Sequence, residues 1–233
     1  ITNADYLIHG SGTVPMVQFV KAVSGLLPFD KVDGLIYRVD GKVTINEASK
    51  EPAWAGGLIP DREHLRIFRK KRLVKTVFSS GCRNRCAFCS IHRDNAFMQR
   101  SISDIRLELE NLLETGVQIV DIEDDDIFSD CDFAAELLHL LEYFHKKGLE
   151  FTALNGLTAK NIVPFAGRLY NAGFIKLDLS LVSGSGTVSS ELGRPHGIDE
   201  IEQIQKAVQG KIDIEVFIIP GLPGTTFTKT LET

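Results

Sequence analysis

Three cysteines lie close together in the segment 81–89, which reads Gly-Cys-Arg-Asn-Arg-Cys-Ala-Phe-Cys. Cys82, Cys86 and Cys89 therefore have the spacing Cys-x3-Cys-x2-Cys. Cysteine thiolates are the ligands that hold the irons of iron–sulfur clusters. Three thiolates can bind three irons of a cubane cluster and leave the fourth iron without a protein ligand nearby. The spacing therefore predicts a redox cluster with one position open to a small molecule.

Two other uses of these cysteines compete with a cluster. Zinc could bind the three thiolates together with His92, but structural zinc sites usually pair two short knuckles that lie apart in sequence, and only one is present. A disulfide framework is disfavoured because the 233 residues contain four cysteines, three of them clustered. Cys131, at the start of a predicted helix, is interpreted as an ordinary half-buried residue. A non-catalytic protein with a structural metal stays an alternative.

The composition is that of a globular protein. Hydrophobic residues make up 43% of the chain, and the net charge of −5 gives no electrostatic argument for nucleic-acid binding. No apolar run approaches the roughly 18 residues of a membrane span, and no secretory signal is visible. Because an oxygen-sensitive thiolate cluster suits a reducing compartment, the sequence predicts a cytoplasmic protein without membrane or nucleic-acid partners.

Strand and helix signals alternate along residues 73–219, which favours parallel strands joined by crossover helices. Strands are predicted at 73–78, 117–122, 151–155, 174–181 and 212–219, and helices between 101 and 116, between 133 and 148, around 161–171 and at 198–208. Parallel α/β folds bind ligands at the carboxyl ends of their strands. The cysteine segment follows the first strand, so other strand ends should meet it there.

The cysteine segment resembles the radical S-adenosylmethionine (SAM) superfamily, including the aromatic Phe88 before the last cysteine. The resemblance implies a [4Fe-4S] cluster on Cys82, Cys86 and Cys89. The open iron would take the amino and carboxylate groups of SAM. One electron, from a reductant such as flavodoxin or ferredoxin, would then cleave SAM to a 5′-deoxyadenosyl radical. The implied fold is a partial (β/α)6 barrel, of which five strands are predicted after residue 72.

The second strand ends in Glu-Asp-Asp-Asp-Ile-Phe at 123–128, which resembles the Asp-Asp-x-Phe form of many superfamily members. The resemblance implies that Asp125 and Asp126 bind the amino group of SAM. A carboxylate suits an ammonium because charge-assisted hydrogen bonds are strong. An acidic loop or helix cap without a ligand is the alternative.

Two later segments resemble further parts of the superfamily. In Val-Ser-Gly-Ser at 182–185, Ser183 is kept, while Val182 replaces the glutamate of many relatives. Gly-Arg-Pro-His at 193–196 makes Arg194 a candidate for the SAM carboxylate, because a guanidinium pairs well with carboxylates. His196 could move protons or be structural. The end of the fifth strand resembles the adenine-contacting segment, with Ile219 against the base and Gly221 allowing close approach.

The fourth predicted strand alternates between apolar and polar residues. Its apolar set should pack on helices. Its polar set, Lys176, Asp178 and Ser180, should line the barrel lumen, together with Asn155 and Glu215 from neighbouring strands. A solvent-exposed polar face is the alternative.

Three segments are predicted. Residues 1–58, with an Asp-Gly hairpin, resemble the C-terminal remnant of an α/β cobalamin-binding-type domain, found in one subgroup of the superfamily. Residues 59–72 are a basic linker or a polyanion site, and 73–233 form an incomplete core barrel. None of the six histidines has the Asp-x-His-x-x-Gly cobalamin signature, so cobalamin binding is not supported in this chain, although a longer parent could bind it.

The sequence is thus identified as a radical SAM enzyme of the cobalamin-domain subgroup, truncated at both ends, that acts on an unknown substrate. A radical SAM tRNA methylthiotransferase is a second alternative, but the further cysteine trio and basic tail expected of it are not found.

Overall fold

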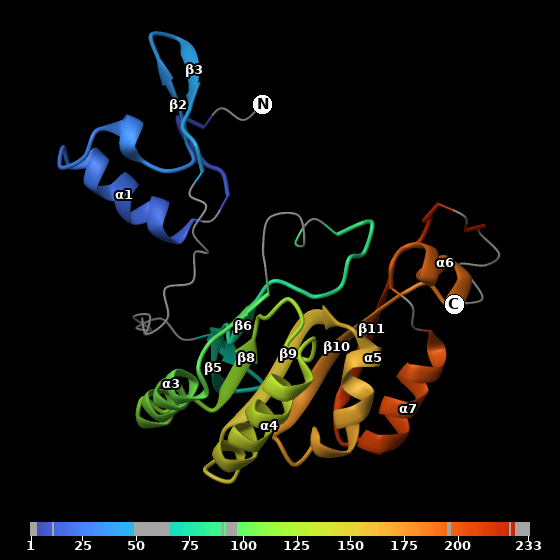
Figure 1. Cartoon of the computed structure of the whole chain (residues 1–233). Coiled ribbons are helices and arrows are strands. Elements are labelled where there is room, and N and C mark those ends of the chain that lie inside the picture. Colours follow the sequence, from blue (N-terminus) through green and yellow to red (C-terminus); the bar gives the residue numbers. More distant parts are fainter. Residues whose placement is uncertain are drawn as a thin grey trace. The chain divides into compact units, whose positions relative to one another are not determined.

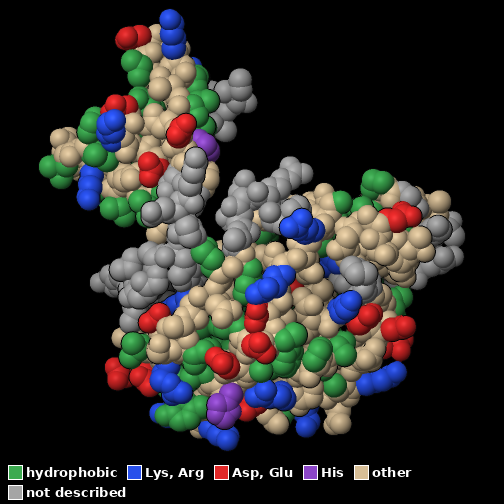
Figure 2. All heavy atoms as spheres, viewed as in Figure 1, with side chains coloured by type: hydrophobic (Ala, Val, Ile, Leu, Met, Phe, Trp, Pro, Cys, Tyr) green, Lys and Arg blue, Asp and Glu red, His purple; other side chains and the backbone are tan. Residues whose placement is uncertain are grey.

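The structure, a computed structural model, describes residues 4–10, 12–48, 66–89, 91, 97–194, 197–223, 225 and 226. The chain divides into two compact units, residues 1–58 and residues 59–233. Figure 2 shows lysines, arginines and acids interspersed over the visible face of the second unit. Within the described residues, no helix is long and apolar enough to cross a membrane.

The first unit is a small antiparallel sheet with one α-helix. The sheet has the strand order β1-β2-β3, and the predicted Asp-Gly hairpin is confirmed between β2 and β3. Asp40 and Gly41 both have positive φ, as the tight turn of such a hairpin requires. The elements are β1 (Tyr6–Ile8), α1 (Thr13–Val23), the 3-10 helix η1 (Phe29–Lys31), β2 (Leu35–Val39) and β3 (Lys42–Ile45).

The second unit contains a six-stranded sheet with the order β11-β10-β9-β8-β5-β4. Strands β5, β8, β9, β10 and β11 are parallel, whereas β4 is antiparallel to β5. The five parallel strands confirm the predicted α/β partial barrel. The strands are β4 (Arg66–Phe68), β5 (Lys71–Thr76), β8 (Ile119–Ile122), β9 (Glu150–Leu157), β10 (Phe174–Val182) and β11 (Asp213–Ile218).

The helices α3, α4, α5 and α7 cover one face of this sheet (Figure 1). The predicted stripe of α3, Ile105, Leu109 and Leu112, is buried in the same core as Leu177 and Leu179 of β10. The apolar side of β10 therefore packs on helices, as expected from its alternation. The helices are α3 (Ile102–Glu114), α4 (Cys131–His145), α5 (Ala159–Ile162), α6 (Gly186–Glu191) and α7 (Ile198–Val208), with the 3-10 helix η2 (Val163–Arg168) after α5.

Two segments differ from the prediction. Residues 66–72, expected in a linker, form a hairpin of β4 and β5 in which Arg69 and Lys70 have positive φ. The helix expected around 161–171 is broken into α5 and η2. Pro164 lies at the start of η2, where its missing N–H and fixed φ interrupt regular α-helical bonding.

Candidate active site

Two short paired strands, which we call the neck, hold the two ends of the chain segment that contains the cysteine loop, residues 81–89. Strand β6 (Ser79–Ser80) pairs antiparallel with β7 (Met98–Gln99) on the far side of the loop. Next to this pair, the backbone N–H of Arg100 donates to the carbonyl of Phe78 at 2.9 Å. The loop therefore leaves the sheet just after β5, at the carboxyl end of the parallel strand that lies between β8 and the antiparallel β4.

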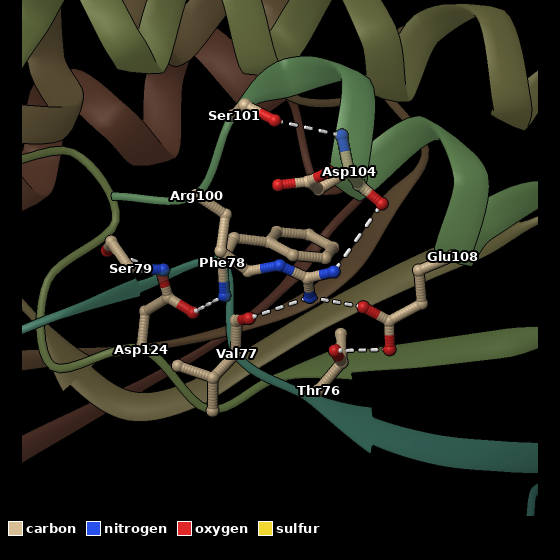
Figure 3. A network of polar contacts seen from close by, with 9 residues as sticks. All are labelled: Thr76, Val77, Phe78, Ser79, Arg100, Ser101, Asp104, Glu108 and Asp124. Carbon is tan, nitrogen blue, oxygen red and sulfur yellow. Dashed lines mark hydrogen bonds and ion pairs between the residues drawn. The ribbon is translucent and has the colours of Figure 1, made fainter. Parts of the chain in front are cut away.

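A buried ion pair fixes the segment that leads into the loop (Figure 3). The guanidinium of Arg100 pairs with Glu108 of α3, and the side chains are only 8% and 1% exposed. Glu108 also accepts from the hydroxyl of Thr76 at 2.8 Å, while Arg100 donates to the carbonyl of Val77 at 3.3 Å. These contacts tie the end of β5 to helix α3.

The acid run after β8, residues 124–126, accepts hydrogen bonds from the cysteine loop and the residues just before it. Asp124 is fully buried and accepts from the backbone N–H groups of Phe78 at 2.7 Å and Ser79 at 2.5 Å, two of the contacts drawn in Figure 3. Burial raises the pKa of Asp124 to about 7, although these hydrogen bonds oppose the shift. This carboxylate anchors the neck of the loop.

The next two acids hold points farther along the loop. Asp125 accepts from the backbone N–H of Gly81 at 2.7 Å. Asp126 accepts from the side-chain amides of Asn161 at 2.9 Å and Asn84 at 3.4 Å, and burial raises its pKa. Three consecutive carboxylates thus bind successive parts of the segment 78–84.

A cavity of about 290 Å³ lies against the cysteine loop. All three clustered cysteines line it and none forms a disulfide. Burial raises the pKa of the Cys82 thiol, while hydrogen bonds from Asn84 oppose this. Among the described residues, no three His, Cys, Asp or Glu side chains are grouped to hold one metal ion. The lining residues are Cys82, Asn84, Cys86, Phe88, Cys89, Ile91, Asp125, Asn155, Gly156, Thr158, Ser180, Arg194, Phe217 and Ile219.

Arg194 brings a buried positive charge to the cavity. One of its terminal nitrogens donates to the carbonyl of Gly156 at 3.2 Å, and the other lies 3.8 Å from the sulfur of Cys86. Its Nε is buried without a hydrogen-bond partner. A buried cation with an unsatisfied N–H favours an anion beside it. Three thiols and this guanidinium therefore fit a thiolate-bound cluster together with a carboxylate ligand.

The turn that carries Arg194 packs closely on the cysteine loop. The backbone N–H of Ala87 donates to the carbonyl of Leu192 at 2.9 Å. Gly193 has a φ of +74°, and a Cβ added there would lie 2.7 Å from the carbonyl oxygen of Arg85. Only glycine combines this backbone conformation with so close an approach.

The cavity brings together some of the predicted site residues but not others. Phe88, Asp125 and Ile219 line it with the cysteines and Arg194. Asp126, Ser183 and Gly221 are not among the described lining residues. Ser183 is buried and accepts from the backbone N–H of Ser185 at 3.2 Å. His92 and His196 lie outside the described residues.

Gly221 and Val182 both sit in unusual turns. Gly221 has a φ of +75°. Val182 has a φ of 71°, which is rare for a β-branched residue, and the N–H of Ser183 donates back to the carbonyl of Leu181 at 2.9 Å. The carbonyl of Val182 accepts from the N–H of Ile219 at 3.0 Å. This turn therefore fixes one wall of the cavity.

The polar side chains of β10 behave as the alternation indicates. Ser180 lines the cavity, and so does Asn155 from β9. One step down the same side of the strand, Asp178 is buried, which raises its pKa. Lys176 pairs with Asp178 at 3.6 Å and with Glu215 at 2.7 Å. This side of the sheet therefore carries charged side chains that form ion pairs within and between strands.

Several residues that line the cavity were not predicted from the sequence. Asn84 lies inside the cysteine loop, and Thr158 follows the carboxyl end of β9. Phe217 lies in β11, two residues before Ile219, which follows the strand, and both side chains line the cavity. Each of these residues could have been proposed from the sequence, because each lies next to a predicted strand end or between the cysteines.

Comparison with known proteins agrees with this geometry. Residues 76–233 match the family described as the Radical SAM superfamily, and no curated protein matches the chain. The radical SAM methyltransferase TsrM from Kitasatospora setae has a TM-score of 0.78 at 17% identity, over 97% of this chain and 48% of its own. The cobalamin-dependent SAM radical enzyme OxsB has a TM-score of 0.70 at 15% identity, over 97% of this chain and 35% of its own. The chain thus spans half or less of these proteins, and at such identities the likeness concerns the fold. The family match, which covers the cysteine loop and every described residue that lines the cavity, means that this chain belongs to the radical SAM superfamily.

Proposed function

We propose that this chain is the core of an enzyme that cleaves SAM reductively and delivers a 5′-deoxyadenosyl radical to a substrate not yet identified. The observation that carries the proposal is a single cavity lined by Cys82, Cys86, Cys89 and the buried Arg194. Superfamily membership implies a [4Fe-4S] cluster and SAM. When bound, the reduced cluster supplies the electron that breaks the carbon–sulfur bond of SAM.

The side chains of the cavity have distinct tasks in this proposal. The three cysteine thiolates would hold three irons. Arg194, with its Nε unsatisfied, would pair with the carboxylate of SAM, because guanidinium and carboxylate form strong bidentate contacts. Asp125 lines the cavity and would accept from the ammonium group.

Apolar residues would hold the adenosine part. Phe88 and Ile219 line the cavity and are 39% and 38% exposed, so both can still cover a ligand. Gly221 and Ser183 would contribute to SAM binding indirectly, because they lie in turns that shape the wall of the cavity. We assign Asp126 to holding the cysteine loop, since its carboxylate already accepts from Asn84 and Asn161.

The wider organisation is part of the same proposal. Residues 1–58 would be the end of a cobalamin-binding-type domain, 59–72 the connection, and 73–233 the radical SAM barrel. The fold likeness to a cobalamin-dependent enzyme supports this division. We assign no cobalamin ligand to this chain, because its histidines lack the expected signature. An electron donor such as flavodoxin or ferredoxin would reduce the cluster.

Anaerobic reconstitution tests the cluster. The chain should bind close to four iron and four sulfide, as a cubane requires. Cys82→Ala, Cys86→Ala and Cys89→Ala should each abolish this loading. Cys131→Ala is the matched control, because that thiol is exposed on α4 and should be dispensable. A chain that binds zinc and lacks the visible absorption of an iron–sulfur cluster would overturn the assignment. A cluster that survives loss of one of the three cysteines would also overturn it.

SAM titration into the loaded chain tests the ligand site. Arg194→Gln and Asp125→Asn should each weaken SAM binding by about 1.5–3 kcal/mol, the value of a hydrogen bond to a charged group. Asp132→Asn, an exposed acid in the first turn of α4, should leave the affinity unchanged. Unchanged affinity in both cavity variants would mean that SAM binds elsewhere.

A further inference from the structure

Asn84 is placed to act on one cluster ligand. Its backbone N–H and its side-chain Nδ2 both lie 3.4 Å from the sulfur of Cys82. The same Nδ2 is 2.9 Å from the hydroxyl oxygen of Thr158 and 3.4 Å from Asp126. Two amide hydrogens are thus shared among three acceptors, one of which is a cysteine sulfur lining the cavity.

The partners of Asn84 are themselves fixed. The carboxylate of Asp126 is buried, and it accepts from the Nδ2 of Asn161 at 2.9 Å and from the backbone N–H of Phe128 at 3.3 Å. Thr158 is also buried, just beyond the end of β9. Both neighbours of the Asn84 amide present acceptor oxygens. They therefore hold its nitrogen, rather than its oxygen, on the side that reaches the sulfur.

Hydrogen bonds to ligand sulfurs are one of the means by which a protein sets the potential of an iron–sulfur cluster. An N–H donor stabilises the reduced cluster more than the oxidised one, because the reduced form carries more negative charge on its sulfurs. A donor at Cys82 therefore makes the cluster easier to reduce.

We infer that Asn84 raises the reduction potential of the cluster through Cys82, and that Asp126 is a positioning residue that orients Asn84. The inference rests on the proposed function, since it needs a cluster on the three cysteines. Asp126 would thus influence electron transfer to the cluster, rather than contact SAM.

The test is a redox titration of the anaerobically reconstituted full chain, followed by electron paramagnetic resonance, with iron and sulfide measured alongside. Asn84→Ala removes the side-chain donor but keeps the backbone N–H. Asn84→Asp keeps the shape without the donor. Asn155→Ala is the matched control, because Asn155 also lines the cavity but donates to the carbonyl of Glu123. The signal comes only from molecules that hold a cluster, so partial loading does not distort the potential.

Asn84→Ala should lower the reduced-to-oxidised ratio at a fixed potential about tenfold, which for one electron is a shift of about 59 mV to lower potential. Asn84→Asp should shift the potential in the same direction and at least as far. Asp126→Asn loosens Asn84, which lowers the potential, but also removes a carboxylate near Cys82, which raises it, so its potential should lie above that of Asn84→Ala. Asn155→Ala should leave the potential unchanged. An unchanged potential in both Asn84 variants would overturn the inference, as would an equal shift in Asn155→Ala. Complete loss of the cluster from both Asn84 variants would also overturn it, because Asn84 would then serve assembly. A wild-type chain that takes up no cluster would refute the proposed function itself.

Discussion

Replacing Glu108 with alanine should destabilise the second unit strongly. Glu108 is 1% exposed and is the carboxylate partner of the buried Arg100. Removing one member of a buried ion pair leaves the other charge uncompensated, which costs about 3–5 kcal/mol. The hydroxyl of Thr76 also loses its acceptor, at about 1 kcal/mol. The loss would be a large part of a typical total stability of about 5–15 kcal/mol.

Urea unfolding of the cluster-free chain, followed by circular dichroism, measures this effect. Glu202→Ala is the control, because Glu202 pairs with Lys206 on the exposed side of α7 and should contribute no more than about 0.5 kcal/mol. The double variant Arg100→Met with Glu108→Leu removes both charges and should come within about 1 kcal/mol of the wild type or exceed it.

The reasoning would be refuted if Glu108→Ala cost less than about 1 kcal/mol, or if the double variant lost as much as the single one. Iron loading gives a second reading. Arg100 also donates to the carbonyl of Val77, so an intact network holds the entry to the cysteine loop. The double variant loses this contact as well, so both variants should bind less iron than the wild type at equal protein concentration.

Three further predictions concern charge and close packing. As the pH rises from 5 to 7, the free energy of unfolding of the wild type should fall by about 1 kcal/mol per pH unit relative to that of Asp124→Asn. The reason is that the pKa of the Asp124 carboxyl is about 7 in the folded chain and 3.8 ordinarily, so between these values only the folded chain keeps the proton. Urea unfolding at several pH values measures this, and an equal pH dependence of the wild type and Asp124→Asn would contradict it. Gly193→Ala should reduce iron loading, because its Cβ would meet the carbonyl oxygen of Arg85 at 2.7 Å; full loading would show that the turn can move. Gly34→Ala should speed hydrogen exchange in β1 and β2 but not in the second unit, because its Cβ would lie 2.3 Å from the carbonyl oxygen of His9, and protected β1 amides would argue otherwise.

The order of elements was predictable because periodicity and turn residues are local signals. The helix 198–208 and the hairpin around Asp40 and Gly41 appear as expected. The alternating order of strands and helices also predicted that other strand ends lie near the cysteine loop, because loops after parallel strands share that edge. Arg194 was placed in the site by resemblance, and the structure brings it to the cavity.

The acid run shows where sequence reasoning stops. Asp124, Asp125 and Asp126 are chemically identical, and a short loop gives no periodicity from which side-chain direction can be read. Only the folded backbone decides that one carboxylate holds the neck, one lines the cavity and one binds Asn84. No local pattern encodes these choices.

Glu108 is a different case, because a signal was present. It stands three residues after Ile105 and four before Leu112, which places a charge within the buried stripe of α3. A charge at such a position needs a partner. The partner, Arg100, lies just before the helix and could have been sought there.

The grip of the acid run on the cysteine loop has a consequence for biosynthesis. The loop is made before everything that fixes it: Asp124 follows Phe78 by 46 residues, and Arg194 follows Cys86 by 108. At a ribosomal rate of about 5–20 residues per second, the thiols wait roughly 5–20 s for that arginine. During this interval they are open to oxidation and to wrong metals. Iron insertion into the nascent chain would therefore be premature, and a cell that makes this protein must keep the three thiols reduced until the sheet has closed around them.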